Sequence, residues 1–249
     1  MKYKHLIKGD QMDILSKITV VAIGILAGMY LSGCGSDNTS SGVDNGVGSC
    51  VAHNGTEYCD VTSPYTGKIW LDRNLGAAEV CIALDDTACY GDYYQWGRNF
   101  DGHQNKNSET TDTLATDVNN AGNKFITGAG EWTSVDSDGS IRHINWSKID
   151  GSSVSPAGYR IPTKEELVAE TIREEIANST DIFDNFLKLP YAGFREDIEG
   201  ELIDLGKHGF LWSSSMDSEN AYALSFVGVV VGSFLNTRST GYPARCIKN

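Results

Sequence analysis

Residues 90–103, YGDYYQWGRNFDGH, combine aromatic rings with two aspartates, an arginine and a histidine. Aromatic rings beside charged hydrogen-bonding groups are typical of surfaces that bind sugars. The polar side chains of this segment are therefore the candidate ligand-binding residues: Tyr94, Arg98, Asp101 and His103.

The same segment also has the pattern of a short helix. Asp92 is suited to cap such a helix and Gly97 to end it. Tyr93, Trp96 and Phe100 would then share one buried stripe. We therefore expect a packing element that presents a smaller polar edge to a ligand.

The sequence contains few patterns of catalysis. It has no GxSxG, no HExxH and no phosphate-binding glycine loop, and the serines of LWSSS have no identifiable base. Asp92 and Asp101 could in principle serve as a catalytic carboxylate pair, but sequence spacing cannot place them on either side of a scissile bond. The sequence therefore predicts neither catalytic residues nor an enzyme.

Metal-binding patterns are also sparse. Four dispersed histidines lack metal-ligand spacing, namely His53, His103, His143 and His208. Asp136 and Asp138, in the turn DSDGS, could hold calcium, but a solvated acidic turn is the favoured interpretation. We therefore expect no metal and no cofactor, with calcium as the open alternative.

The amino terminus has the order of a signal peptide. Four lysines precede an apolar run from Ile18 to Leu31, and LSGC then ends at Cys34. Residues 31–34 resemble the lipobox of bacterial lipoproteins, which implies that Cys34 is acylated and anchors the mature chain to a membrane. An uncleaved anchor or an ordinary secretory signal is the alternative, and Met12 is an alternative start.

Composition restricts the location and the partners. An aspartate directly after the acylated cysteine would favour retention in the inner membrane. This chain has Gly35 at that position, which indicates the outer membrane. The sequence leaves open on which face of that membrane the protein lies. The formal net charge is −13, and residues 1–33 carry four lysines and two aspartates, so the remaining chain carries −15. This charge argues against nucleic-acid binding.

Residues 34–49 are predicted to form a flexible tether, and residues 50–249 a single domain.

Five cysteines remain after Cys34, and two pairings follow from local geometry. Asn54-Gly55 predicts a two-residue hairpin turn, and counting outward places Cys50 opposite Cys59 at a position where side chains approach closely. Cys81 and Cys89 could close a short acidic loop. Cys246 is left over, and we expect a buried apolar residue rather than a reactive thiol.

The rest of the chain predicts an α+β domain. The region from residue 101 to 140 has the composition of long irregular loops. Thr163 and Glu166 form a capping box, and Val168, Ile172 and Ile176 predict the buried stripe of a helix, with Glu170 on its solvated face. A shorter helix is expected over 180–187. Strands then follow, one of them predicted over AYALSFVGVVVG.

Six segments in order resemble the Fibrobacter succinogenes major paralogous domain family, and they cover nearly all of residues 50–249. They are SPYTGKIWLDRNLG, CYGDYYQWGRNFDGH, PAGYRIPTKEEL, LPYAGFRE, LWSSS and GYPARCIK. The last four also resemble Lcl C-terminal domains. The resemblance implies a C-type-lectin-like fold, with a twisted antiparallel sheet, one or two flanking helices and long irregular loops. Many relatives have a cysteine directly before PAGYR, where this chain has Ser155.

The resemblance also implies a function. Members are typically exported or surface-attached, and the Lcl relatives imply adhesion to polysaccharides. We therefore expect a lipid-anchored cell-envelope module that binds carbohydrate or an envelope protein through its loops. Alternatives are an envelope structural protein and an enzyme on the related formylglycine-generating scaffold. The enzyme is disfavoured because that activity uses a late cysteine pair, and only Cys246 lies late in this chain.

Overall fold

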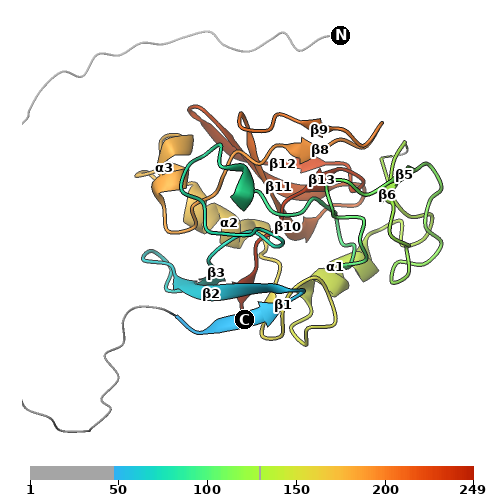
Figure 1. The fold of residues 1–249 in the computed structure, drawn as a ribbon, viewed down its shortest axis with the longest axis horizontal. Helices are drawn as coiled ribbons and strands as arrows, with labels where there is room; N and C mark the ends of the chain where they lie inside the picture. The colour runs from blue at the N-terminus through green and yellow to red at the C-terminus, as the bar shows by residue number, and fades with distance from the viewer. Residues whose placement is uncertain (1–47, 129) are drawn as a thin grey trace, which may run out of the picture. The chain divides into compact units, whose positions relative to one another are not determined.

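The computed structural model describes residues 48–128 and 130–249, and all of them belong to one compact unit. Three short α-helices lie among small, mostly antiparallel sheets, so the expected α+β class is confirmed (Figure 1). The predicted signal peptide, Cys34 and most of the predicted tether lie outside the described residues. Within the described residues, no helix has both the length and the apolar character needed to span a membrane.

The first hairpin has the predicted register. β1 (Cys50–His53) pairs with β2 (Thr56–Thr62), and Cys50 lies opposite Cys59. Asn54 and Gly55 both have positive φ, as a type I′ turn requires. Pairing begins slightly before the expected domain boundary, because the Ser49 carbonyl accepts a hydrogen bond of 2.8 Å from the Asp60 N–H.

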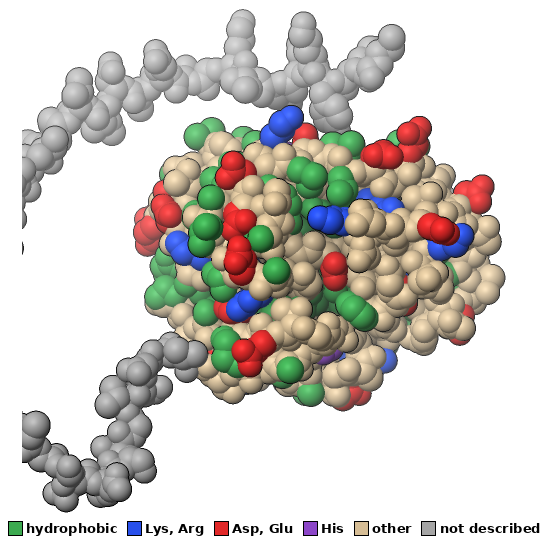
Figure 2. Space-filling view, viewed as in Figure 1, with side chains coloured by type: hydrophobic (Ala, Val, Ile, Leu, Met, Phe, Trp, Pro, Cys, Tyr) green, Lys and Arg blue, Asp and Glu red, His purple; other side chains and the backbone are tan. Residues whose placement is uncertain are grey.

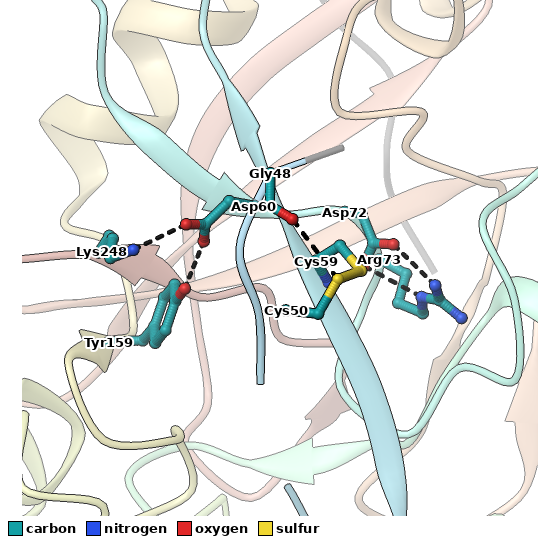
Figure 3. Close-up of a disulfide and its surroundings, with 8 residues drawn as sticks. All are labelled: Gly48, Cys50, Cys59, Asp60, Asp72, Arg73, Tyr159 and Lys248. Atoms are coloured by element: carbon teal, nitrogen blue, oxygen red, sulfur yellow. Dashed lines mark hydrogen bonds and ion pairs between the residues drawn. A yellow bond between two sulfur atoms is a disulfide. The ribbon is translucent and has the colours of Figure 1, made fainter. Parts of the chain in front are cut away.

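Both disulfides expected from the sequence are present, Cys50–Cys59 and Cys81–Cys89. Figure 3 shows the first bridge beside Asp60 on β2. The Asp60 carboxylate accepts from the Tyr159 hydroxyl and from Lys248 Nζ at 2.7 Å. Asp60 thereby joins the first hairpin to strands from the middle and the end of the chain.

Those strands belong to a five-stranded sheet with the order β1-β2-β3-β14-β7. The additional strands are β3 (Ile69–Leu71), β14 (Ile247–Lys248) and β7 (Tyr159–Arg160). The last strand of the chain therefore lies between β3 and β7. Figure 1 shows the carboxyl terminus close to the first hairpin for this reason.

A three-stranded meander forms a second sheet from β10 (Gly209–Met216), β11 (Ala221–Val227) and β12 (Val230–Asn236). The single strand expected over residues 221–232 is wrong, because the chain reverses at residues 228–229. Gly228 has a φ of 55°, which a continuous strand does not use.

The third sheet contains the segment with which the sequence analysis began. Its order is β4-β13-β8-β9, formed by β4 (Tyr94–Gln95), β13 (Gly241–Tyr242), β8 (Phe194–Arg195) and β9 (Leu202–Ile203). A parallel pair, β5 (Thr110–Thr111) and β6 (Phe125–Ile126), and a 3₁₀ turn at Thr87–Cys89 complete the set.

The helix expected from Asp92 to Gly97 is therefore wrong. Three buried tryptophan side chains instead donate their indole N–H to carbonyls of this segment, at 2.8–3.0 Å. They are Trp212 to Tyr94, Trp132 to Trp96, and Trp146 to Arg98. These hydrogen bonds from distant indoles use the carbonyls of the segment and hold it extended. Phe100 is 44% exposed, so it does not belong to the expected buried stripe.

Helix α2 (Lys164–Thr171) begins with the predicted capping box of Thr163 and Glu166. It ends earlier than expected, and Ile172 is exposed. Glu170 lies on its buried face, not on the solvated face, and accepts hydrogen bonds from the hydroxyls of Ser63 and Thr66 at 2.6 and 2.5 Å. These hydroxyls satisfy the carboxylate inside the protein.

Helix α3 (Ser179–Asp184) is close to the predicted second helix, and α1 (Ser140–Ser147) was not expected. Cys246 is fully buried, as predicted, and burial raises the pKa of its thiol to about 12. Its Sγ lies 3.1 Å from the hydroxyl of Ser155. Such a thiol stays protonated and unreactive.

Candidate functional site

The four predicted ligand-binding residues lie in or just after β4, and three of them form one network. Arg98 Nε donates to Asp101 Oδ2 at 2.8 Å, and His103 Nδ1 donates to Asp101 Oδ1 at 2.6 Å. The exposed polar edge expected from the sequence is corrected, because Tyr94, Arg98 and His103 are each at most 1% exposed. These three side chains therefore present no exposed edge to a ligand.

His103 is held in one tautomer by its two partners. Its Nε2 accepts the Gln95 main-chain N–H at 3.1 Å, so the proton lies on Nδ1, which faces Asp101. Burial, assisted by Arg98, lowers the pKa of His103 to about 4. The ring is therefore neutral near pH 7 and serves to fix Asp101 beneath the surface.

Arg98 connects this network to a loop about 20 residues further along the chain. Its Nη2 donates to the carbonyls of Ala121 and Gly122 at 3.3 and 3.0 Å, and its Nη1 donates to Gln95 Oε1 at 2.7 Å. The planar fork of a guanidinium suits several simultaneous bonds of this kind. One buried side chain thus fixes the loop around residues 121–122.

Arg195 on β8 plays the same part for a neighbouring loop, and the sequence analysis did not identify it. It donates to the Ser108 hydroxyl at 2.6 Å, to the Ser108 carbonyl at 2.7 Å, and to the carbonyls of Asn105 and Gly200 at 3.1 and 2.8 Å. Most of these partners lie about 90 residues away, so no local pattern could indicate them.

Above these arginines lies a surface that we call the polar loop face, formed by residues 101–109, 119–124 and 199–202. It contains three adjoining hollows of about 410, 480 and 350 Å³. The first two share Asn107, Ser108 and Glu109, and the first and third share Asn123. Their linings are dominated by asparagine, serine, glycine and charged side chains.

The part of the surface over β5 and β6 is also poor in apolar groups. In the view of Figure 2, the region over β5 and β6 displays few apolar side chains, whereas apolar and acidic side chains mix on the opposite side. Asparagine offers two donors and one acceptor, and serine offers both functions in one hydroxyl. The polar loop face can therefore make paired hydrogen bonds to a ligand that is rich in hydroxyl groups.

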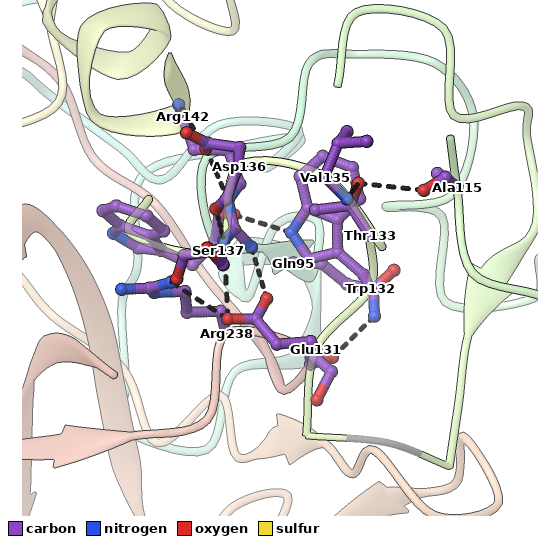
Figure 4. A network of polar contacts seen from close by, with 12 residues as sticks. Gln95, Ala115, Glu131, Trp132, Thr133, Val135, Asp136, Ser137, Arg142 and Arg238 are labelled. Atoms are coloured by element: carbon purple, nitrogen blue, oxygen red, sulfur yellow. Dashed lines mark hydrogen bonds and ion pairs between the residues drawn. The ribbon is translucent and has the colours of Figure 1, made fainter. Parts of the chain in front are cut away.

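A second network, drawn in Figure 4, adjoins the first at the ring of Trp132, over which both Arg98 and Arg142 lie. Arg142 Nε donates to Asp136 Oδ2 at 3.0 Å, and Arg238 Nη1 donates to Glu131 Oε1 at 3.0 Å. The Asp136 carboxylate also accepts the N–H groups of Ile141 and Arg142, at the start of α1. This network positions α1 against the core.

The expected solvated turn at Asp136 and Asp138 is therefore only half correct. The Asp138 side chain is exposed, but that of Asp136 is buried and engaged with Arg142. Among residues 48–128 and 130–249, no three histidine, cysteine, aspartate or glutamate side chains gather as metal ligands would. Calcium binding stays an untested alternative, and the described residues offer no preformed cluster of ligands for it.

Two arrangements of the described side chains bear on catalysis. Asp101 is bound to Arg98 and His103, while Asp92 faces a different cavity, so the two carboxylates do not form a pair. The hydroxyl of Ser225 lies 2.8 Å from His208 Nε2, which is a nucleophile–base contact that the sequence did not indicate. In the described part of the chain, no carboxylate pairs with His208 to orient it.

Comparisons with protein-family models, curated proteins and solved structures found no match for this chain. The site must therefore be interpreted from its own geometry. Its distinctive feature is a polar surface on irregular loops whose main chain is fixed from below by buried arginines.

Proposed function

We propose that this protein is an exported, lipid-anchored module of the bacterial cell envelope, and that its polar loop face binds carbohydrate. The leader and the lipobox-like LSGC support export and acylation of Cys34. The family resemblance supports a C-type-lectin-like fold, for which the small antiparallel sheets, flanking helices and long loops are suitable.

One observation carries the proposal about binding. Arg98 and Arg195 are almost fully buried, yet their donors are directed to loop carbonyls rather than to solvent. When a ligand binds, each flexible side chain that becomes fixed costs roughly 0.5–1.5 kcal/mol of conformational free energy, and ordering a loop adds to this cost. A loop surface that is ordered beforehand avoids much of this cost. We infer that the arginines hold the polar loop face ready for a ligand.

The side chains on this face favour a neutral polysaccharide over a charged one. Lys106 and Lys124 are accompanied by Glu109, Glu199 and Glu201, and the chain as a whole is acidic. A sulfated polymer would be repelled by the bulk charge and would find no basic cluster here. Hydroxyl groups, in contrast, can exchange hydrogen bonds with the asparagines.

The test is a glycan array probed with the purified full-length chain. We expect wild-type binding to neutral glycans that is strongly reduced in Asn107→Ala/Asn123→Ala, which alters two exposed residues of the polar loop face. Asn249→Ala, at the exposed end of the chain, is the matched control. A wild-type protein that binds no glycan would favour an envelope structural role instead.

Anchoring has a separate test. Cells grown with a labelled fatty acid should incorporate the label into the wild-type protein and not into Cys34→Ala. Label that persists in the variant would show that acylation, if present, occurs elsewhere.

A further inference from the structure

A small cavity lies between the tip of the first hairpin and the segment that precedes and follows β4. It has a volume of about 150 Å³, and its lining includes His53, Tyr58, Asp92, Tyr94 and Phe100. An engineered cavity of about this volume holds a benzene molecule, so the space suits a six-membered ring or a short alkyl chain. It is separate from the three hollows of the polar loop face.

The wall of the cavity is built around a glycine. Gly76 has a φ of 78°, and a Cβ added there would lie 2.3 Å from Asp92 Oδ2. The Gly76 N–H donates to the Tyr58 hydroxyl at 2.8 Å, and the Asp92 N–H donates to the Leu75 carbonyl at 2.9 Å. These contacts place the Asp92 carboxyl against Gly76 at the edge of the space.

Asp92 differs from three other aspartates of this chain that are shielded from water and paired with a cation. Asp60 is paired with Lys248, Asp101 with Arg98, and Asp136 with Arg142. Within residues 48–128 and 130–249, no lysine, arginine or histidine forms an ion pair with Asp92. Its carboxyl therefore has the cavity, rather than a cationic side chain, as its neighbour.

The groups around Asp92 do not replace the hydration that its carboxyl loses on burial. Tyr94 provides a side-chain hydrogen bond, and burial raises the pKa of Asp92 to about 6. The other titratable groups that line the cavity are Tyr58 and His53, and His53 Nε2 donates to the Val154 carbonyl at 2.9 Å. A carboxyl that is desolvated without a cation gains most from a ligand that brings one.

Aromatic rings complete the chemistry of the cavity. Tyr58 and Tyr94 line it from β2 and β4, and Phe100 is 44% exposed beside it. A cation near an aromatic ring is attracted by about 0.5–2 kcal/mol, and the attraction is greater where water is excluded. A carboxylate together with rings is the combination that recognises an ammonium group.

We propose that this cavity binds a protonated primary amine, with Asp92 as its counter-ion and Phe100 as part of an aromatic wall. Its size admits the amine of an amino sugar or of a lysine side chain, which share this chemistry. The inference does not depend on carbohydrate binding by the polar loop face, since the two sites have no lining residue in common.

The test is titration calorimetry of the full-length protein at pH 7, about one unit above the pKa of Asp92, where its carboxyl is mostly ionised and both amines are mostly protonated. D-glucosamine is compared with D-glucose, and Nα-acetyl-lysine methyl ester with its norleucine analogue. We expect at least one amine to bind and its neutral counterpart not to bind. Binding by glucosamine alone assigns the cavity to amino sugars, and binding by the lysine derivative alone assigns it to peptide chains.

Variants distinguish this site from weak binding elsewhere. Asp92→Asn should weaken amine binding by about tenfold or more, and Phe100→Ala by a few fold. Asp112→Asn, an exposed aspartate after β5, is the matched control and should leave binding unchanged. The proposal is overturned if neither amine binds, or if Asp92→Asn binds the amine as tightly as the wild type. Circular dichroism of each variant verifies that it is folded.

Discussion

Replacing Asp92 by asparagine should stabilise the protein, because the substitution removes a carboxyl that has lost its hydration beside the cavity. Burial raises the pKa of Asp92 from 3.8 to about 6, so ionising it costs more in the folded than in the unfolded state. The shift is roughly two pKa units, each worth about 1.4 kcal/mol, which gives an upper limit of about 3 kcal/mol above pH 6. Asparagine cannot ionise and avoids this cost.

The sign of the pH dependence follows from the raised pKa. The folded state retains the Asp92 proton where the unfolded state has lost it, so this group's contribution to stability falls as pH rises from about 4 to about 6. His103 acts in the opposite direction, because its pKa of about 4 makes stability fall as pH decreases below about 6.5. The quantity to measure is therefore the difference between wild type and Asp92→Asn, in which the His103 contribution cancels.

Urea denaturation at pH 4 to 8 measures this difference. We expect the variant to gain stability relative to the wild type as pH rises, reaching a plateau above pH 6. Asp112→Asn should show no such trend. A variant that is equally or less stable than the wild type at pH 7.5 would refute the reasoning, because Asp92 would then be compensated within the protein.

Three further substitutions test other parts of the structure. Ser155→Cys should form a disulfide with Cys246 under oxidising conditions, since Cys246 Sγ and Ser155 Oγ lie 3.1 Å apart in the wild type. The bridge should raise the free energy of unfolding by about 2–4 kcal/mol. Free thiols at both positions in peptide mapping would contradict this prediction. Arg98→Met should destabilise the fold by about 3 kcal/mol in urea denaturation, because Asp101 loses its partner. Glu170→Gln should cost about 1–3 kcal/mol in the same assay, and an unchanged stability would contradict a stabilising role for its bonds to Ser63 and Thr66.

The parts of the fold that the sequence predicts correctly depend on local signals. Asn54 and Gly55 define the turn, and counting residues outward from it gives the register and the Cys50–Cys59 bridge. The start of α2 is equally local, since Thr163 and Glu166 are three residues apart. In both cases, the interacting groups lie within ten residues of each other.

The errors arise where distant groups decide the structure. The segment around Tyr94 has a helical pattern, but indoles 36–118 residues away bind its carbonyls. Glu170 has the residue type of a solvated face, but hydroxyls more than 100 residues away satisfy it. Arg195 was not identified because its loop partners are also distant. Residue type alone cannot indicate such partners.

The predicted site shows the same division. The sequence singled out Arg98, Asp101 and His103 as candidate binding residues, and their side chains do meet. It could not show that they meet beneath the surface, because burial depends on how the later strands pack. The Asp92 cavity was also missed, since its lining joins the first hairpin to residues about 40 positions away.

Hydrogen–deuterium exchange of the full-length protein, with and without a neutral glycan selected on the array, tests the central claim most directly. If the polar loop face is the binding surface, glycan should slow exchange in residues 101–109, 119–124 and 199–202. The buried arginines also predict that these loops already exchange slowly without ligand. Protection confined to other elements, or loops that exchange freely in the unbound protein, would contradict the account.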